Sequence, residues 1–159
     1  TGITADSRLG AVYTSRYRIA LVSADSITIC SIPIRCCMDV QTIIKELEQT
    51  YPAKLIKQLP EDIPTQIVCE FDPPAEHPEY SLAVAIIDRS EAHYHKRSTV
   101  IYRVLKGELK LHVGDEEFDM YEGQEYTITP GQVHWAEGNS TWIEVYSSPG
   151  SEQSDHILV

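Results

Sequence analysis

Residues 93–107 read HYHKRSTVIYRVLKG, and this stretch decides the fold because two histidines are followed directly by alternating apolar and polar residues. Successive side chains of a β-strand point to opposite faces, so His93 and His95 project together, and Glu91 joins them if the strand begins early enough. Neutral imidazoles at this spacing can bind one divalent transition metal ion, each through one ring nitrogen. A pair of this kind is also common on protein surfaces, so its surroundings decide between the two interpretations.

Short apolar segments punctuated by glycine surround this stretch. Strands are predicted at TQIVCEF (65–71), SLAVAIID (81–88), ELKLHV (108–113), EEFDMYEG (116–123), QEYTITPG (124–131) and TWIEVYSS (141–148), with a hairpin turn at Gly114-Asp115. Segment 81–88 is apolar enough to be covered on both faces. Several short strands at close spacing predict an all-β sandwich or barrel of antiparallel strands.

One amphipathic helix is predicted before the strands, at DVQTIIKELEQT (39–50). Its apolar residues recur at helical spacing and make one stripe, and Asp39 can cap the free amides of its first turn. Tyr51-Pro52 ends the helix. A shorter helical turn is expected from Lys54 to Leu59, and both segments are expected to belong to the core rather than to carry chemistry.

Residues 1–37 are richer in Ser, Thr, Arg and Cys than the rest and poor in acids. They are either an extension before a domain that begins at Met38, or an edge hairpin in which RYRIALV and SITICSI pair around Ala24-Asp25-Ser26, and the hairpin is favoured. Residues 38–159 are expected to form a single domain.

The charge excludes two classes of partner. Thirteen basic and 24 acidic residues give a formal charge of -11, which repels nucleic-acid phosphates and anionic membrane surfaces. No apolar run approaches the ~18 residues that a membrane helix needs.

The four cysteines, Cys30, Cys36, Cys37 and Cys69, make no CxxC pair and are expected to be reduced thiols, so a cytoplasmic location is expected.

Two motifs within residues 83–146 resemble those of the cupin superfamily. The first has the form HxH, three or four residues, Glu, six residues, Gly, and HYHKRSTVIYRVLKG keeps both histidines and Gly107. The second has the form Gly, five residues, Pro-x-Gly, two residues, His, three residues, Asn, and GQEYTITPGQVHWAEGN supplies Gly123, Gly131 and His134. Thr129 and Gly138 stand at the proline and asparagine positions.

The resemblance implies a cupin-type antiparallel β-barrel or jelly roll in which the two motifs meet. His93, His95 and His134 would then converge on one metal ion. The glycines of the motifs stand where strands turn sharply, which favours a positive φ or a close backbone approach.

The departure from the family pattern lies at the fourth ligand, a glutamate in the motif. Val100 occupies that position, or Thr99 in the shorter form of the motif, and neither is a carboxylate. Three explanations stay open: a site of three histidines alone, a site completed by Glu91 or Glu144, or a barrel that has lost its metal.

Three neutral ligands would leave the charge of the ion uncompensated and about three coordination positions open to water, an anionic substrate or dioxygen. Some cupin dioxygenases resemble this chain in having no glutamate ligand, so an iron(II) dioxygenase is the leading hypothesis, although zinc, nickel, manganese or copper also suit imidazoles. The alternatives are a sugar-phosphate isomerase or epimerase, and a non-catalytic metabolite-binding or dimerisation barrel.

Alternation along the first motif places Val100, Tyr102 and Val104 inside the barrel and the residues between them outside. Tyr102 could therefore contact a substrate or donate a proton, and Arg97 could clamp an anionic group. The expected partners are a small polar or anionic metabolite and a second copy of the chain in a homodimer.

Overall fold

The computed structural model describes residues 11–14, 18–23, 26–28 and 38–159, and the chain divides into two compact units, Thr1–Cys37 and Met38–Val159. The strands of the first unit are β1 (Ala11–Thr14), β2 (Arg18–Ser23) and β3 (Ser26–Thr28). They form an antiparallel sheet of their own in the order β1-β2-β3, so the predicted hairpin corresponds to β2 and β3. The end of its second strand and three of the cysteines lie outside the described residues.

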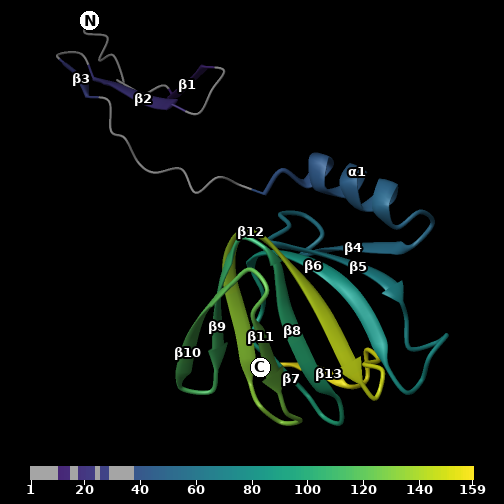
Figure 1. Ribbon diagram of the computed structural model, residues 1–159. Helices are drawn as coiled ribbons and strands as arrows, with labels where there is room; N and C mark the ends of the chain where they lie inside the picture. The colour runs from purple at the N-terminus through teal and green to yellow at the C-terminus, as the bar shows by residue number, and fades with distance from the viewer. Residues whose placement is uncertain (1–10, 15–17, 24–25, 29–37) are drawn as a thin grey trace, which may run out of the picture. The chain divides into compact units, whose positions relative to one another are not determined.

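The second unit is a curled antiparallel sheet with one helix beside it (Figure 1). Its elements are α1 (Val40–Thr50), β4 (Leu55–Leu59), β5 (Gln66–Asp72), β6 (Ser81–Arg89), β7 (His93–His95), β8 (Thr99–Lys106), β9 (Glu108–Val113), β10 (Glu116–Tyr121), β11 (Glu125–Ile128), β12 (His134–Ser148) and β13 (His156–Leu158). The fold class is the one predicted, a mainly β cupin-like barrel with an N-terminal helix.

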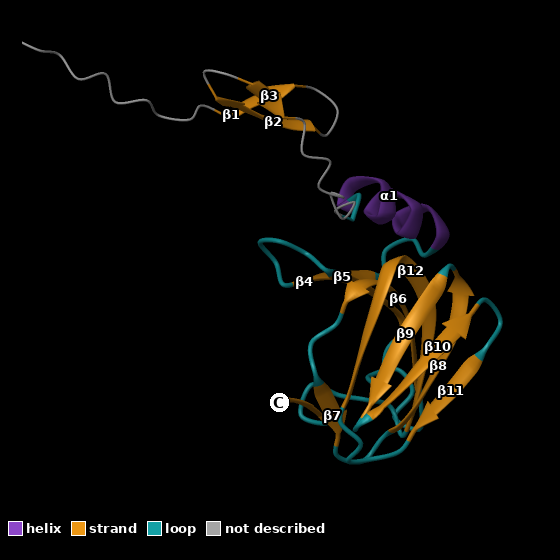
Figure 2. Ribbon diagram, turned by 90° about the vertical axis from the view of Figure 1, so that its left-hand side faces the viewer, coloured by secondary structure: helices purple, strands orange, loops and turns teal. Residues whose placement is uncertain are grey.

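The long strand β12 organises this sheet. It pairs with β6 on one side, and on the other with β9 through its first residues and β8 through its last. The change of partner falls at a register shift between Glu137 and Thr141, where the strand bends. Figure 2 shows the resulting curl, which brings the start of β12 beside β7.

Apolar side chains fill both faces of β6, as its sequence predicts. Ala85 and Ile87 belong to the cluster inside the curled sheet, with the inward residues of β8 and β9. Val84 and Ile86 belong to a second cluster that includes Ile43 and Leu47 of α1. The helix therefore covers the outer face of β5 and β6, and the inward side chains of the strands fill the interior of the curl.

The helix begins and ends close to the predicted residues. Asp39 is its N-cap, and its carboxylate accepts a hydrogen bond from the Thr42 amide at 3.2 Å. The expectation of a second helical turn from Lys54 to Leu59 is wrong, because this segment is strand β4. It pairs with β5 along its whole length, and hydrogen bonding to that edge outweighs the weak helical pattern.

Turns between the strands have the geometry that the glycines predict. Gly107 has a φ of 92° and Gly131 a φ of 82°, values that side chains other than glycine rarely adopt. Cys69 is a free, buried thiol, as expected. Within the described residues, no helix has the length and apolar character needed to cross a membrane.

Candidate metal centre

Three histidines meet inside the barrel. His93 and His95 lie on the same face of β7, and His134 is the first residue of β12 and pairs with His93 across the strands. Their exposed fractions are 6%, 7% and 0%. One nitrogen from each ring lies within 4.8 Å of the others, a spacing that allows all three to bind one metal ion.

The Nδ1 atom of each ring already has a hydrogen-bond partner. His93 Nδ1 lies 2.8 Å from the Glu91 carbonyl oxygen, and His134 Nδ1 lies 2.9 Å from that of Gln132. His95 Nδ1 lies 2.9 Å from the Ser151 hydroxyl. A carbonyl can only accept, so Nδ1 of His93 and His134 carries the proton and Nε2 keeps its lone pair.

The Nε2 atom of His134 is buried and has no hydrogen-bond partner among the described residues. A buried nitrogen lone pair without a partner is costly, and such atoms commonly mark a position where an ion or water binds. The donor set, three neutral imidazoles with their outer nitrogens held, is the one that first-row transition metals accept. The residues present therefore fit a metal ion.

The environment keeps these rings neutral. Burial is the largest cause that lowers the pKa of His93 to about 3 and that of His134 to about 4, and repulsion from neighbouring imidazoles adds to it. Burial followed by the nearby His156 also lowers the pKa of His95. At neutral pH a metal ion would not have to displace protons from the rings.

Comparison with known proteins agrees with this geometry. Residues 85–146, which include all three histidines, match the family model of the cupin domain. This match supports the resemblance to the cupin superfamily that the two sequence motifs indicate. Among curated proteins, the comparison finds no match.

Several solved structures share the cupin fold. They include the Streptomyces protein Pac13, described as a unique nucleoside dehydratase, with 15% identity over 60% of this chain and 78% of that one and a TM-score of 0.55. KdgF from Halomonas sp. has 14% identity over 61% and 89%, with a TM-score of 0.53. A protein from Planctomyces limnophilus has 17% identity over 68% and 92%, with a TM-score of 0.57. At these identities the likeness shows the fold alone.

The position of the cupin glutamate is apolar in this structure. Val100 is fully buried in the interior cluster of the barrel, and it is an inward residue of β8 like Tyr102 and Val104. Glu91 is exposed, and the group of nitrogens that can share a metal ion does not include its carboxylate. Within the part of the chain that the structure describes, three histidines therefore come together without an acidic ligand.

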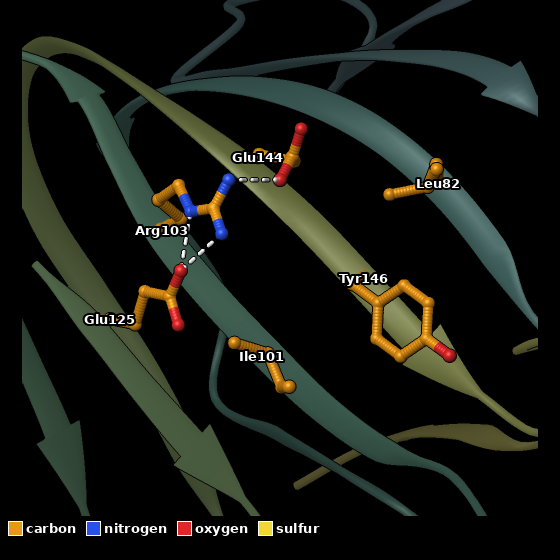
Figure 3. Close-up of a pocket in the computed structure, with 6 residues that line it drawn as sticks. All are labelled: Leu82, Ile101, Arg103, Glu125, Glu144 and Tyr146. Carbon is orange, nitrogen blue, oxygen red and sulfur yellow. Dashed lines mark hydrogen bonds and ion pairs between the residues drawn. The ribbon is translucent and has the colours of Figure 1, made fainter. Parts of the chain in front are cut away.

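Glu144 does not take the place of that glutamate, because it lies on the outer face of the barrel. Its carboxylate is 3.5 Å from the guanidinium of Arg103, which also pairs with Glu125. Figure 3 shows these side chains around a pocket of about 190 Å³, lined also by Ile101 and Tyr146. This pocket belongs to the opposite side of β8 from Tyr102 and the histidines, and is separate from the candidate metal centre.

Tyr102 and Arg97, the other two predicted site residues, lie in different surroundings. The Tyr102 ring is buried and meets the His134 ring edge to face, 5.8 Å between centroids, and burial raises the pKa of its hydroxyl. Arg97 lies in the bend after β7, so the face of His93 and His95 ends before it. Its side chain is 62% exposed and lies 3.6 Å from Asp155.

The sequence reasoning missed the contribution of the C-terminal segment. His156 is exposed, and its ring also stacks on His93 with 4.1 Å between centroids and lies 5.4 Å from His95. Strand β13 pairs with β7 and sets His156 opposite His95, on the face that carries the site. The one signal was the alternation of His156 and Leu158 in a segment too short to predict a strand.

Proposed function

We propose that this cupin is a small-molecule metalloenzyme that binds one divalent transition metal ion through His93, His95 and His134. The observation that carries the proposal is the arrangement of the ring nitrogens. Each Nδ1 has a hydrogen-bond partner, and one nitrogen from each ring lies within 4.8 Å of the others, close enough to bind one ion. The unpartnered Nε2 of His134 supports the same conclusion.

Oxygenation of a small polar or anionic molecule is the reaction we favour, with iron(II) as the metal. A bound ferrous ion with three neutral ligands would supply redox chemistry and open positions for a substrate and dioxygen. The absence of an acidic ligand among the described residues of the site is what favours this reaction over a cupin isomerase. The dehydratase activity is a property of Pac13, which this chain resembles in fold alone, so it does not change this preference.

The residues around the histidines have defined tasks in this proposal. The buried hydroxyl of Tyr102 stays protonated because burial raises its pKa, so it can donate a hydrogen bond to a substrate oxygen. Val100 and Val104 exclude water from the interior side of the site. His156 lies on the exposed side of the cluster, where a substrate would arrive.

Metal titration of the purified, metal-free protein tests the site. Iron(II), zinc, nickel and manganese are each added, and one ion per chain is expected to bind to the wild type and none to His134→Ala. His77→Gln is the matched control, because Asp72, Glu76 and His77 form a second, more exposed group that could hold an ion. Equal metal content in wild type and His134→Ala would reject the site.

Oxygen consumption tests the reaction. The iron-loaded protein is expected to consume dioxygen in the presence of a catechol, diketone or thiol from a small panel, and His134→Ala is expected to consume none. Stoichiometric metal binding without oxygen uptake on any compound would reject the dioxygenase and leave the isomerase and the binding barrel.

A further inference from the structure

The C-terminal segment, residues 149–159, supplies the hydrogen-bond partner of one candidate ligand, His95. Strand β13 pairs with β7, and Ser151 and Asp155 lie in the segment just before it. His93 and His134 bond to backbone carbonyls two residues from themselves. His95 instead meets side chains from a segment 56 residues further along the chain.

Ser151 and Asp155 form a short chain of polar contacts on His95 Nδ1. The Ser151 hydroxyl is 2.9 Å from Nδ1 and 3.5 Å from Asp155 Oδ2, and Oδ2 is itself 3.4 Å from Nδ1. An ionised carboxylate can only accept, so Ser151 donates to Asp155 and accepts from His95. Whether His95 Nδ1 donates to the Ser151 hydroxyl or directly to Asp155 Oδ2, Nδ1 carries the proton. The lone pair of Nε2 is then free to bind a metal ion.

Asp155 is held firmly enough to orient another side chain. Its carboxylate has no exposed area and accepts hydrogen bonds from the backbone amides of Arg97 at 2.7 Å and Ser98 at 3.3 Å. The guanidinium of Arg97 lies 3.6 Å from the same group. These contacts join the bend after β7 to the C-terminal segment, so the position of the carboxylate is set from two directions.

We propose that Asp155, acting through Ser151, is a positioning residue that sets the tautomer and ring orientation of His95. The effect of Asp155 on metal binding rests on the proposed function above. Its effect on the tautomer of His95 does not, because the tautomer exists without a metal ion. The C-terminal segment is in this way part of the metal centre, although it supplies no ligand. Outer-shell partners of histidine ligands typically change metal affinity about 10- to 100-fold when they are lost.

Two measurements on the variants Asp155→Asn and Ser151→Ala test the proposal. Zinc affinity by competition with a chromophoric chelator is expected to fall about 10- to 100-fold in Asp155→Asn and by a smaller factor in Ser151→Ala. Nitrogen-15 NMR of the metal-free protein is expected to show the Nδ1-protonated tautomer of His95 in the wild type. In Asp155→Asn the amide can donate to Nδ1, so a shift toward the Nε2-protonated tautomer is expected.

Glu152→Gln is the matched control, because Glu152 lies in the same segment, is 63% exposed and has its closest charged partner in Arg97. It is expected to keep both the affinity and the tautomer. Ser151→Ala leaves the bonds from Asp155 to the backbone intact, so it still tests the proposal if Asp155→Asn fails to fold. Wild-type affinity and tautomer in Ser151→Ala and in a folded Asp155→Asn would overturn the inference.

The two proposals can fail separately. If the wild type binds no metal, the proposed function fails, and a tautomer change in the variants would still support the role of Asp155. If the wild type binds zinc and the variants bind it equally with an unchanged tautomer, the proposed function stands and Asp155 is not a positioning residue.

Discussion

Acidification should destabilise the metal-free protein through its histidine cluster. The pKa of His93 is about 3 and that of His134 about 4 in the folded state, against 6.5 for an ordinary histidine. The unfolded chain therefore binds more protons than the folded chain between these values. Stability is full above pH 6.5, falls as the pH drops below it, and stops falling from this cause near pH 3–4.

The size of the effect follows from the two pKa values. Each ring contributes about 1.4 kcal/mol per pH unit below 6.5, which gives about 2.7 kcal/mol per ring at pH 4.5. Part of each pKa shift arises from repulsion by a neighbouring imidazole, so the contributions of the two rings do not simply add. Together His93 and His134 should therefore remove about 3–5 kcal/mol from the free energy of unfolding, a large part of the total of roughly 5–15 kcal/mol that domains have.

Urea denaturation of the chelator-treated protein at several pH values from 7 to 4.5 measures this loss. His93→Gln should show a slope smaller by about 1.4 kcal/mol per pH unit, since one of the perturbed rings is gone. His77→Gln is the control for removal of a histidine outside the cluster, because its ring is 41% exposed. Identical slopes for wild type and His93→Gln would refute the reasoning.

Three further predictions concern packing and the open ligand position. Leu47→Ala should lower the free energy of unfolding in urea by about 2–5 kcal/mol, because Leu47 is fully buried between α1 and the sheet. Gly138→Ala should cost about 1–3 kcal/mol in the same assay, since the new Cβ would lie 2.6 Å from the carbonyl oxygen of Ile87, and a neutral result would contradict that contact. Val100→Glu places a carboxyl group in the interior and should cost about 2–4 kcal/mol without metal. Thermal melts should show a larger stabilisation by zinc in this variant than in the wild type; an equal zinc response would show that position 100 does not face the ion.

Most of the fold could be predicted because its signals are local. The strands from β5 to β11 follow alternation and turn residues within single segments, and Asp39 begins the helix by contact with its own first turn. The errors fall where pairing with a distant segment decides the structure. Strand β4 depends on the edge of β5, and β12 extends back to His134 because β9 and β7 pair with its first residues.

The candidate site divides in the same way. His93 and His95 are neighbours on one strand, and the spacing of the second motif points to His134. The roles of Ser151, Asp155 and His156 depend on β13 returning to β7, and three residues of strand carry too little pattern to predict that return. Glu144 was open as a ligand because alternation along β12 does not by itself say which face is inside; its pairing with Arg103 on β8 decides it.

Val100 links the fold to the chemistry of the site. As a fully buried member of the interior cluster it contributes to the barrel whether or not a metal ion is bound, so packing alone would explain it. The engaged Nδ1 atoms and the unpartnered Nε2 of His134 are not explained by packing, because an apolar interior gains nothing from three desolvated imidazoles. If a metal ion is the reason for them, a valine at position 100 leaves the ion without a carboxylate ligand among the described residues. The protein as a whole carries a formal charge of -11 and repels anions over distance, so the metal centre would be a local exception that favours an anionic ligand once it arrives. An anionic substrate would then supply the negative charge that the glutamate supplies in other cupins, which is the physical reason to look for the substrate among small carboxylates and enolates.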